Sequence, residues 1–135
     1  MGTASTHCQY PLAVVLPVVP AVVLAVLWSG MGKRERTKGA VFEREVANLM
    51  RGIGYADAKR GIGQARSGGE VPDVDGTPWW IEAKHRKAID VHGAYQQGAD
   101  ASDDRREVLA VTKRDRGDVL VTMSFATFAR LVGRG

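Results

Sequence analysis

The sequence predicts an α/β domain in which helices flank a central mixed β-sheet. Three segments predict this class. Residues 38–51 place apolar side chains at helical spacing, residues 79–85 are aromatic and β-branched as strands prefer, and residues 108–123 give a buried strand followed by an alternating one. In chain order the elements read α-β-β-β-α-β-β-α, and helices interspersed among strands cover the faces of a sheet.

Composition supports one domain and favours a polyanionic partner. The chain has 135 residues, with 19 Lys and Arg against 15 Asp and Glu, which gives a net charge of +4. This length is enough for a single modest core. All of these charges lie at or after Lys33, so residues 33–135 carry the whole positive excess, which suits a polyanionic partner but does not require one. Cys8 is the only cysteine, which excludes an intrachain disulfide and a thiolate zinc cluster.

Residues 1–32 contain no Lys, Arg, Asp or Glu and read as an apolar leader before a folded domain at 33–135. The run at 11–28 is long enough to cross most of a bilayer, and the basic residues at 33–38 would hold that end in the cytoplasm. Met31 offers the other interpretation, in which residues 1–30 are an upstream extension of a cytoplasmic protein. We therefore expect a cytoplasmic domain, with a membrane-anchored form as the alternative.

The first helix is expected from about Lys38 to Arg51, ending near Gly52 and Gly54, with a basic arm at 33–38 before it. Its apolar stripe predicts a core made by Phe42, Val46, Leu49, Met50 and Ile53. Glu43 and Glu45 lie on opposite borders of this stripe. Helical periodicity therefore does not decide which of the two faces a functional site.

A weak strand is expected within 53–60, followed by a glycine-rich loop at 61–69. The glycines indicate a mobile connection and form no phosphate-binding motif of known spacing. Three polar residues of this region are candidates for DNA contact, namely Arg60, Arg66 and Ser67.

Residues 71–87 hold the strongest functional signal. We expect a hairpin with a short strand carrying Asp73, a turn at 75–78 and a second strand at 79–85. Strand alternation places Trp80, Glu82 and Lys84 on one face, and Trp79, Ile81 and Ala83 on the other. Asp73 can reach the first face from the neighbouring strand, and His85 should point away from Lys84.

Two carboxylates beside a lysine suit a hard divalent cation such as Mg²⁺, which prefers oxygen ligands and keeps several waters. Such an ion lowers the pKa of a water and stabilises charge on a phosphate, while Lys84 can orient the water as a compact cation. The alternative is structural. In that interpretation the strand faces solvent with an ordinary Glu–Lys pair, and Asp73 and Asp75 are turn residues.

The remaining elements follow in order. Arg86 and Lys87 belong to a basic cluster that leaves the strand and are candidates for phosphate contact. A helix is expected at 91–101, carrying Tyr95 and Gln96, then a buried strand at 108–112, a turn at 114–117 and a partner strand at 118–123. Ser124 should cap a last helix whose core side is formed by Phe125, Phe128, Ala129, Leu131 and Val132.

Four of these segments resemble a known family when taken together. Pro72-Asp73 with residues 82–84, reading EAK, resembles the PD-(D/E)XK nuclease signature. Residues 38–45, reading KGAVFERE, are similar to the K-G-x-x-x-E-R-E opening of archaeal-type and phage Holliday junction resolvases. Residues 66–69 resemble the Arg-Ser-rich loop before the first aspartate of that family, and residues 95–97 lie where many of its members have a glutamine. The long glycine-rich segment at 61–69 departs from the pattern.

The resemblance implies a restriction-endonuclease-like fold and a metal-dependent endonuclease that hydrolyses phosphodiester bonds in branched DNA during recombination and repair. It implies Mg²⁺, with Mn²⁺ able to substitute, held by Glu43, Asp73 and Glu82. It also implies Lys84 as the residue that positions water, with Gln96 in support. Four-way junctions are the implied partner. Because two strands of a junction are cut symmetrically, a homodimer is implied as well.

Three other functions are compatible with the sequence. A nuclease of the same fold could act on other DNA, as repair and restriction enzymes do, because these motifs encode the chemistry and not the substrate. A non-catalytic DNA-binding module is a second alternative, although a pure binder gains nothing from grouped carboxylates near a phosphate. The third is a membrane-anchored adaptor, which requires the segment at 11–28 to be a true anchor.

Overall fold

The computed structural model describes residues 21–62 and 69–134, with side chains from Gly32 onward. It has an α/β architecture with a five-stranded mixed sheet and three helices among these residues, in the element order predicted from the sequence. The elements are α1 (Ala21–Gly52), β1 (Lys59–Arg60), β2 (Val74–Asp75), β3 (Trp79–Arg86), α2 (Val91–Ala101), β4 (Glu107–Arg114), β5 (Val119–Thr122) and α3 (Phe125–Val132).

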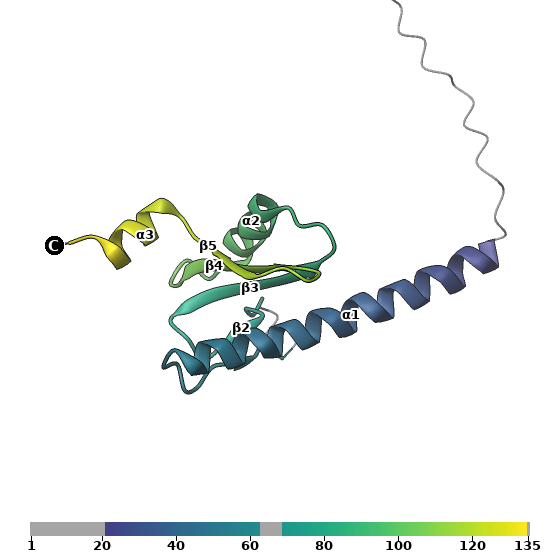
Figure 1. Ribbon diagram of the computed structural model, residues 1–135, viewed down its shortest axis with the longest axis horizontal. Coiled ribbons are helices and arrows are strands. Elements are labelled where there is room, and N and C mark those ends of the chain that lie inside the picture. Colours follow the sequence, from purple (N-terminus) through teal and green to yellow (C-terminus); the bar gives the residue numbers. More distant parts are fainter. Residues whose placement is uncertain (1–20, 63–68, 135) are drawn as a thin grey trace, which may run out of the picture.

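The sheet follows the chain order β1-β2-β3-β4-β5. The central pair β3 and β4 is parallel and joined through α2, whereas the other neighbouring strands are antiparallel. Figure 1 shows α1 beneath the sheet and α2 above it. The alternation along β3 explains this layering, because Ile81 and Ala83 enter the core beside α1, whereas Glu82 faces Gly98 of α2. The predicted division of β3 into two faces is confirmed.

Helix α1 begins at Ala21, so the expected start near Lys38 is wrong. The basic segment at 33–38 is helical rather than an extended arm, because Lys, Arg and Glu have straight side chains that lose little freedom in a helix. Residues 1–20 lie outside the described part, and with them most of the apolar run at 11–28. Of the helices in the described ranges, none combines the length and apolar character needed to cross a membrane.

The end of α1 was predicted correctly, but part of its core stripe was not. Gly54 has φ of 114° and donates to Arg51 O, while the next amide, of Tyr55, donates to Met50 O, which makes a Schellman termination. Phe42, Val46 and Met50 are buried as expected. Two expected core residues, Leu49 and Ile53, are instead 47% and 71% exposed, and Ala47 is buried in their place. The buried arc of the helix is therefore narrower than its apolar arc.

The expected hairpin is present, with a very short first strand. The two-residue strand β2 pairs with β3 only between Val74 and Ile81, and with β1 on its other side. Gly76, with φ of 79°, makes the turn, and a Cβ there would lie 2.0 Å from Asp57 O. The strand expected within 53–60 is limited to Lys59–Arg60. Because β2 is so short, β3 beyond Ile81 has no strand on its β2 side, although β4 pairs with it on the other side, and this opens space for a site.

The last helix does not pack as predicted. Ser124 does cap α3, accepting a hydrogen bond from Thr127 N. All five residues expected in the core are nevertheless exposed, namely Ala129 together with Phe125, Phe128, Leu131 and Val132, which are 80%, 47%, 53% and 57% exposed in turn. Figure 1 shows that α3 stands away from the sheet, to which an ion pair from Arg130 to Glu107 of β4 connects it. The apolar side of this helix is thus not used by the core of the described chain.

Candidate functional site

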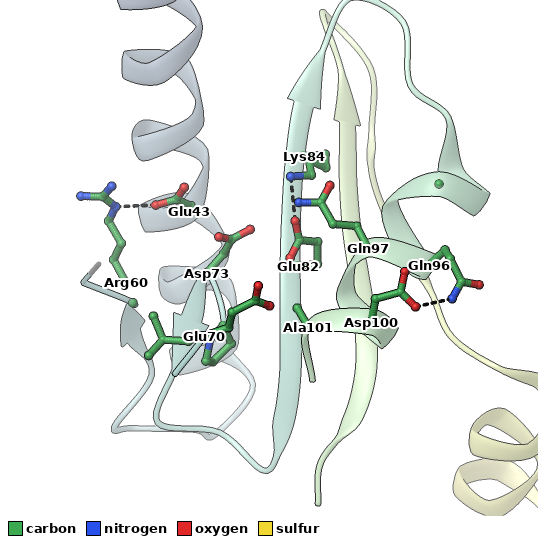
Figure 2. A pocket seen from close by; sticks show the side chains of 14 residues that line it. Glu43, Arg60, Glu70, Asp73, Glu82, Lys84, Gln96, Gln97, Asp100 and Ala101 are labelled. Carbon is green, nitrogen blue, oxygen red and sulfur yellow. Dashed lines mark hydrogen bonds and ion pairs between the residues drawn. The ribbon is translucent and has the colours of Figure 1, made fainter. Parts of the chain in front are cut away.

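A cavity of about 750 Å³ lies where β2 leaves the edge of β3 uncovered. Figure 2 shows that its walls come from α1, from the end of β1, from residues 70–73, from β3 and from α2. Its charged and amide lining residues are Glu43, Arg60, Glu70, Asp73, Glu82, Lys84, Gln96, Gln97 and Asp100. All five residues predicted to be catalytic are therefore brought to one cavity.

Asp73 is fixed by two hydrogen bonds to β3. Its backbone N donates to Ile81 O at 2.9 Å, and its Oδ2 accepts from Ala83 N at 2.8 Å. The carboxylate thus accepts the Ala83 N–H of β3, which would otherwise have donated to a carbonyl of a longer β2. Burial raises the pKa of Asp73 from 3.8 to about 6, and the negative charges of Glu82 and Glu43 add to the rise, against the lowering by the Ala83 hydrogen bond and by Lys84.

Glu82 and Lys84 form an ion pair on the face of β3 that α2 covers. Lys84 Nζ lies 2.7 Å from Glu82 Oε1. Glu82 is only 6% exposed, because Gly98 of α2 packs against its side chain and leaves no room for a larger residue. Lys84 is more accessible and points into the cavity, where its ammonium group can meet a ligand.

The structure places Glu43 and Glu45, which helical periodicity could not tell apart, in different surroundings. Glu43 lines the cavity and accepts a hydrogen bond from Arg60 Nε. Glu45 points elsewhere, toward β4, where its Oε1 lies 2.8 Å from Lys113 Nζ. Of the two, only Glu43 is placed to act with Asp73 and Glu82, as the resemblance implied.

Helix α2 contributes more to the cavity than the sequence analysis anticipated. Gln96 lines it, but its amide Nε2 donates to Asp100 Oδ1 at 2.8 Å. Figure 2 shows Gln97, and not Gln96, pointing toward Glu82 and Lys84. The sequence analysis did not assign Gln97 and Asp100 to the site. A signal for them was present, since Gly93, Gln97 and Asp100 recur at the i, i+4, i+7 spacing of one helix face.

The residues expected to contact DNA are only partly brought together. Arg60 lies at the cavity wall. Arg86 and Lys87 are exposed at the end of β3, and Arg86 also lines a neighbouring hollow with Lys84 and Gln97. Arg66 and Ser67 lie outside the described residues. His85 points away from Lys84 as predicted, with its ring 5.4 Å from that of Phe42 and its Nε2 3.1 Å from Asp115 Oδ1.

The donor set of the cavity fits a hard divalent cation bound partly through water. Mg²⁺ is usually held by one or two carboxylates together with waters and substrate phosphate. Burial is the main cause of the raised pKa of Asp73, and the charges of Glu82 and Glu43 raise it further; a cation would relieve the repulsion from those two charges. Within residues 21–62 and 69–134, no three His, Cys, Asp or Glu side chains lie close enough together to hold a metal ion as they stand. Glu43 and Glu82 are turned instead to Arg60 and Lys84.

Comparison with known proteins adds no relative. No family model, no curated protein and no solved structure matches this chain. The family resemblance therefore rests on the sequence motifs quoted above.

Proposed function

We propose that this chain is a Mg²⁺-dependent DNA endonuclease of the PD-(D/E)XK type, with a restriction-endonuclease-like fold and a preference for four-way junctions. The observation that carries the proposal is that Glu43, Asp73, Glu82 and Lys84 line one cavity although they come from three separate segments of the chain. Grouped carboxylates give a pure DNA-binding module no advantage, because their negative charges repel the phosphates of DNA.

Each residue has a distinct role in this proposal. Asp73 and Glu82 hold Mg²⁺, and Glu43 completes the ligand set from α1. When bound, Mg²⁺ lowers the pKa of a coordinated water and stabilises negative charge on the phosphate. Lys84 orients the attacking water and offsets charge on the phosphate oxygens. In the cutting step the water oxygen would form a bond to phosphorus and give up a proton to solvent, while the phosphorus–oxygen bond to the leaving nucleotide breaks and the leaving oxygen takes a proton from solvent.

Gln97 takes the supporting role that the motif comparison gave to Gln96. Its amide points toward Glu82 and Lys84 and can hydrogen-bond a water or a phosphate oxygen there (Figure 2). DNA approaches along the exposed basic side chains of Arg86 and Lys87, whose positive charges attract phosphates. A homodimer would present two such cavities to the two strands of a junction.

The test uses the full chain with a labelled four-way junction and with a linear duplex of the same sequence. Cutting of the junction is expected with Mg²⁺ or Mn²⁺ and not with EDTA. Asp73→Asn and Glu82→Gln should each reduce the cutting rate by orders of magnitude while DNA binding persists. Asp75→Asn is the matched control, because Asp75 belongs to the same hairpin but pairs with Arg106 outside the cavity.

Two results would separate the alternatives. Equal cutting of the linear duplex would favour a repair or restriction-type nuclease of the same fold. If both cavity variants cut at the wild-type rate, or if DNA is bound but never cut, the catalytic proposal is wrong. The chain would then be a DNA-binding module whose acids serve its structure.

A further inference from the structure

Arg60 occupies a position that the proposed catalytic reaction does not explain. Its Nε donates to Oε2 of Glu43, the carboxylate assigned to the metal from α1. Figure 2 shows the guanidinium on the far side of Glu43 from Asp73 and Glu82. Glu43 therefore already has a cation partner that comes from a different element, β1.

The backbone around Arg60 is held firmly, whereas its side chain is not. Arg60 pairs with Val74 in the sheet, and the following amide, of Gly61, donates to Asp73 O at 2.8 Å. A Cβ at Gly61 would lie 2.0 Å from Pro72 O, so a residue without a side chain is needed for the two segments to approach this closely. The Arg60 side chain is 39% exposed and can leave Glu43 by rotation alone.

Arg60 competes with a bound ion for the carboxylate of Glu43. Glu82 keeps Lys84 beside it on the same strand, and Asp73 forms no ion pair among the described residues. The guanidinium of Arg60 occupies Oε2 of Glu43, one of the two oxygens that an ion could use, and a guanidinium and a divalent cation repel each other. Once released, a guanidinium is the side chain best suited to bidentate contact with a phosphate.

We propose that Arg60 is an exchangeable placeholder for the metal at Glu43, so that metal binding releases its guanidinium to a DNA phosphate at the cavity wall. This inference rests on the proposed function and deepens it. Metal and DNA then reinforce each other, because the ion gives Arg60 to the phosphate and the phosphate removes a competitor of the ion. Arg60 is a positioning and binding residue in this scheme, and it takes no part in breaking the bond.

The experiment measures Mn²⁺ binding by the full chain, from the electron paramagnetic resonance signal of free Mn²⁺ without DNA. Arg60→Gln should bind Mn²⁺ more tightly than wild type, by about fivefold or more. Lys59→Gln is the matched control, because it removes a charge from the neighbouring position on the opposite face of β1, and its affinity should stay at the wild-type value. In a Glu43→Gln background, Arg60→Gln should have no further effect on Mn²⁺ affinity.

A second readout follows DNA affinity by fluorescence anisotropy, in EDTA and in Ca²⁺, a divalent oxygen-binding ion used here in place of Mg²⁺. Ca²⁺ should raise the affinity of the wild type for a duplex and raise that of Arg60→Gln much less. Arg60→Lys keeps the positive charge but lacks the forked N–H donors of the guanidinium, and its response to Ca²⁺ should fall between those of the other two proteins. It replaces Arg60→Gln as the test variant if circular dichroism shows that Arg60→Gln does not fold.

The outcomes distinguish failure of the Arg60 exchange from failure of the proposed metal-dependent function. Suppose the wild type binds Mn²⁺ and Asp73→Asn weakens that binding, but Arg60→Gln binds no tighter than wild type. The exchange is then wrong, and the Arg60–Glu43 pair only ties β1 to α1. If the wild type binds no Mn²⁺, or if Asp73→Asn does not weaken the binding, both the exchange and the metal site are overturned.

Discussion

Asp73 Oδ2 accepts the backbone N–H of Ala83 at 2.8 Å, so a side chain completes the hydrogen bonding of β3 where β2 has ended. The same carboxylate faces the cavity beside Glu82. One residue therefore serves both the edge of the sheet and the proposed metal site. Stability and activity can be separated at this position by choosing the substitution.

Asp73→Ala and Asp73→Asn should differ in stability. Asparagine retains a side-chain oxygen for the buried Ala83 amide, whereas alanine leaves that donor without a partner. We expect Asp73→Ala to have a free energy of unfolding lower than that of Asp73→Asn by about 1–3 kcal/mol. Urea denaturation followed by circular dichroism measures the difference. Equal stability of the two variants would show that water replaces the carboxylate.

Asp73 should also make metal-free stability depend on pH. Its pKa is 3.8 as an ordinary side chain and about 6 in the fold, so the folded state prefers the protonated acid. The contribution of Asp73 to stability is then greatest below pH 3.8 and is lost as pH rises through 6, because the unfolded chain releases its proton first. Relative to Asp73→Asn in EDTA, the wild type should lose about 3 kcal/mol across this range.

Adding Mg²⁺ should restore part of that loss in the wild type and not in Asp73→Asn. Parallel denaturation series at several pH values test both statements. A stability difference between the two proteins that does not change with pH would contradict the burial of a titrating acid at this position.

Glu43→Gln and Glu45→Gln form a matched pair on α1. Glu43 lines the cavity and Glu45 pairs with Lys113, so only the first substitution removes a charge from the site. We expect Glu43→Gln to lower the cutting rate by at least about tenfold and Glu45→Gln to remain near wild type. The difference corresponds to about 1.4 kcal/mol or more of transition-state stabilisation. An essential Glu45 would mean that α1 presents its other border to DNA.

Two glycines in helices should respond oppositely to alanine. A Cβ at Gly98 would lie 2.9 Å from Val108 Cγ1 and 3.1 Å from Glu82 Cβ, so Gly98→Ala must push α2 away from β3. That overpacking should cost about 1–3 kcal/mol and displace Glu82. At Gly39 of α1 a Cβ would meet only Glu43 Oε1, at 4.0 Å. Gly39→Ala should therefore stabilise the protein by about 0.5–1 kcal/mol, through its helix propensity. Thermal unfolding of both variants checks the two signs.

Removal of residues 1–30 should leave the fold intact. The buried side chains of α1 begin at Phe42 in the part of the helix whose side chains are described. We expect the shortened protein to keep its free energy of unfolding within about 0.5 kcal/mol, the range of surface changes. Circular dichroism during urea denaturation measures this, and loss of cooperative unfolding would show that the leader contributes to the core.

The local patterns predicted what depends on local chemistry. Residues 91–101 were predicted as a helix and form α2 with the same bounds, and strand alternation placed Glu82 and Lys84 on one face. Periodicity did not choose between Glu43 and Glu45, because the two lie symmetrically about the apolar stripe. That choice depends on where β1 and β4 lie, which no local pattern encodes.

The error at α3 has a different cause. An apolar face on a helix predicts that something will cover it, but it does not identify what does. Phe125 and Leu131 satisfy the pattern and are still exposed. The start of α1 was misjudged because a run of basic residues was interpreted as solvated arm, although the same residues are good helix formers.

The length of α1 has a practical consequence. From Ala21 to Phe42 the helix rises about 30 Å at ~1.5 Å per residue, and Figure 1 shows this part extending beyond the sheet. A fluorophore, an affinity handle or a surface tether attached near Ala21 would be carried on a rigid spacer. The probe would stay clear of the cavity while remaining fixed in orientation to it, which suits distance measurements to labelled DNA.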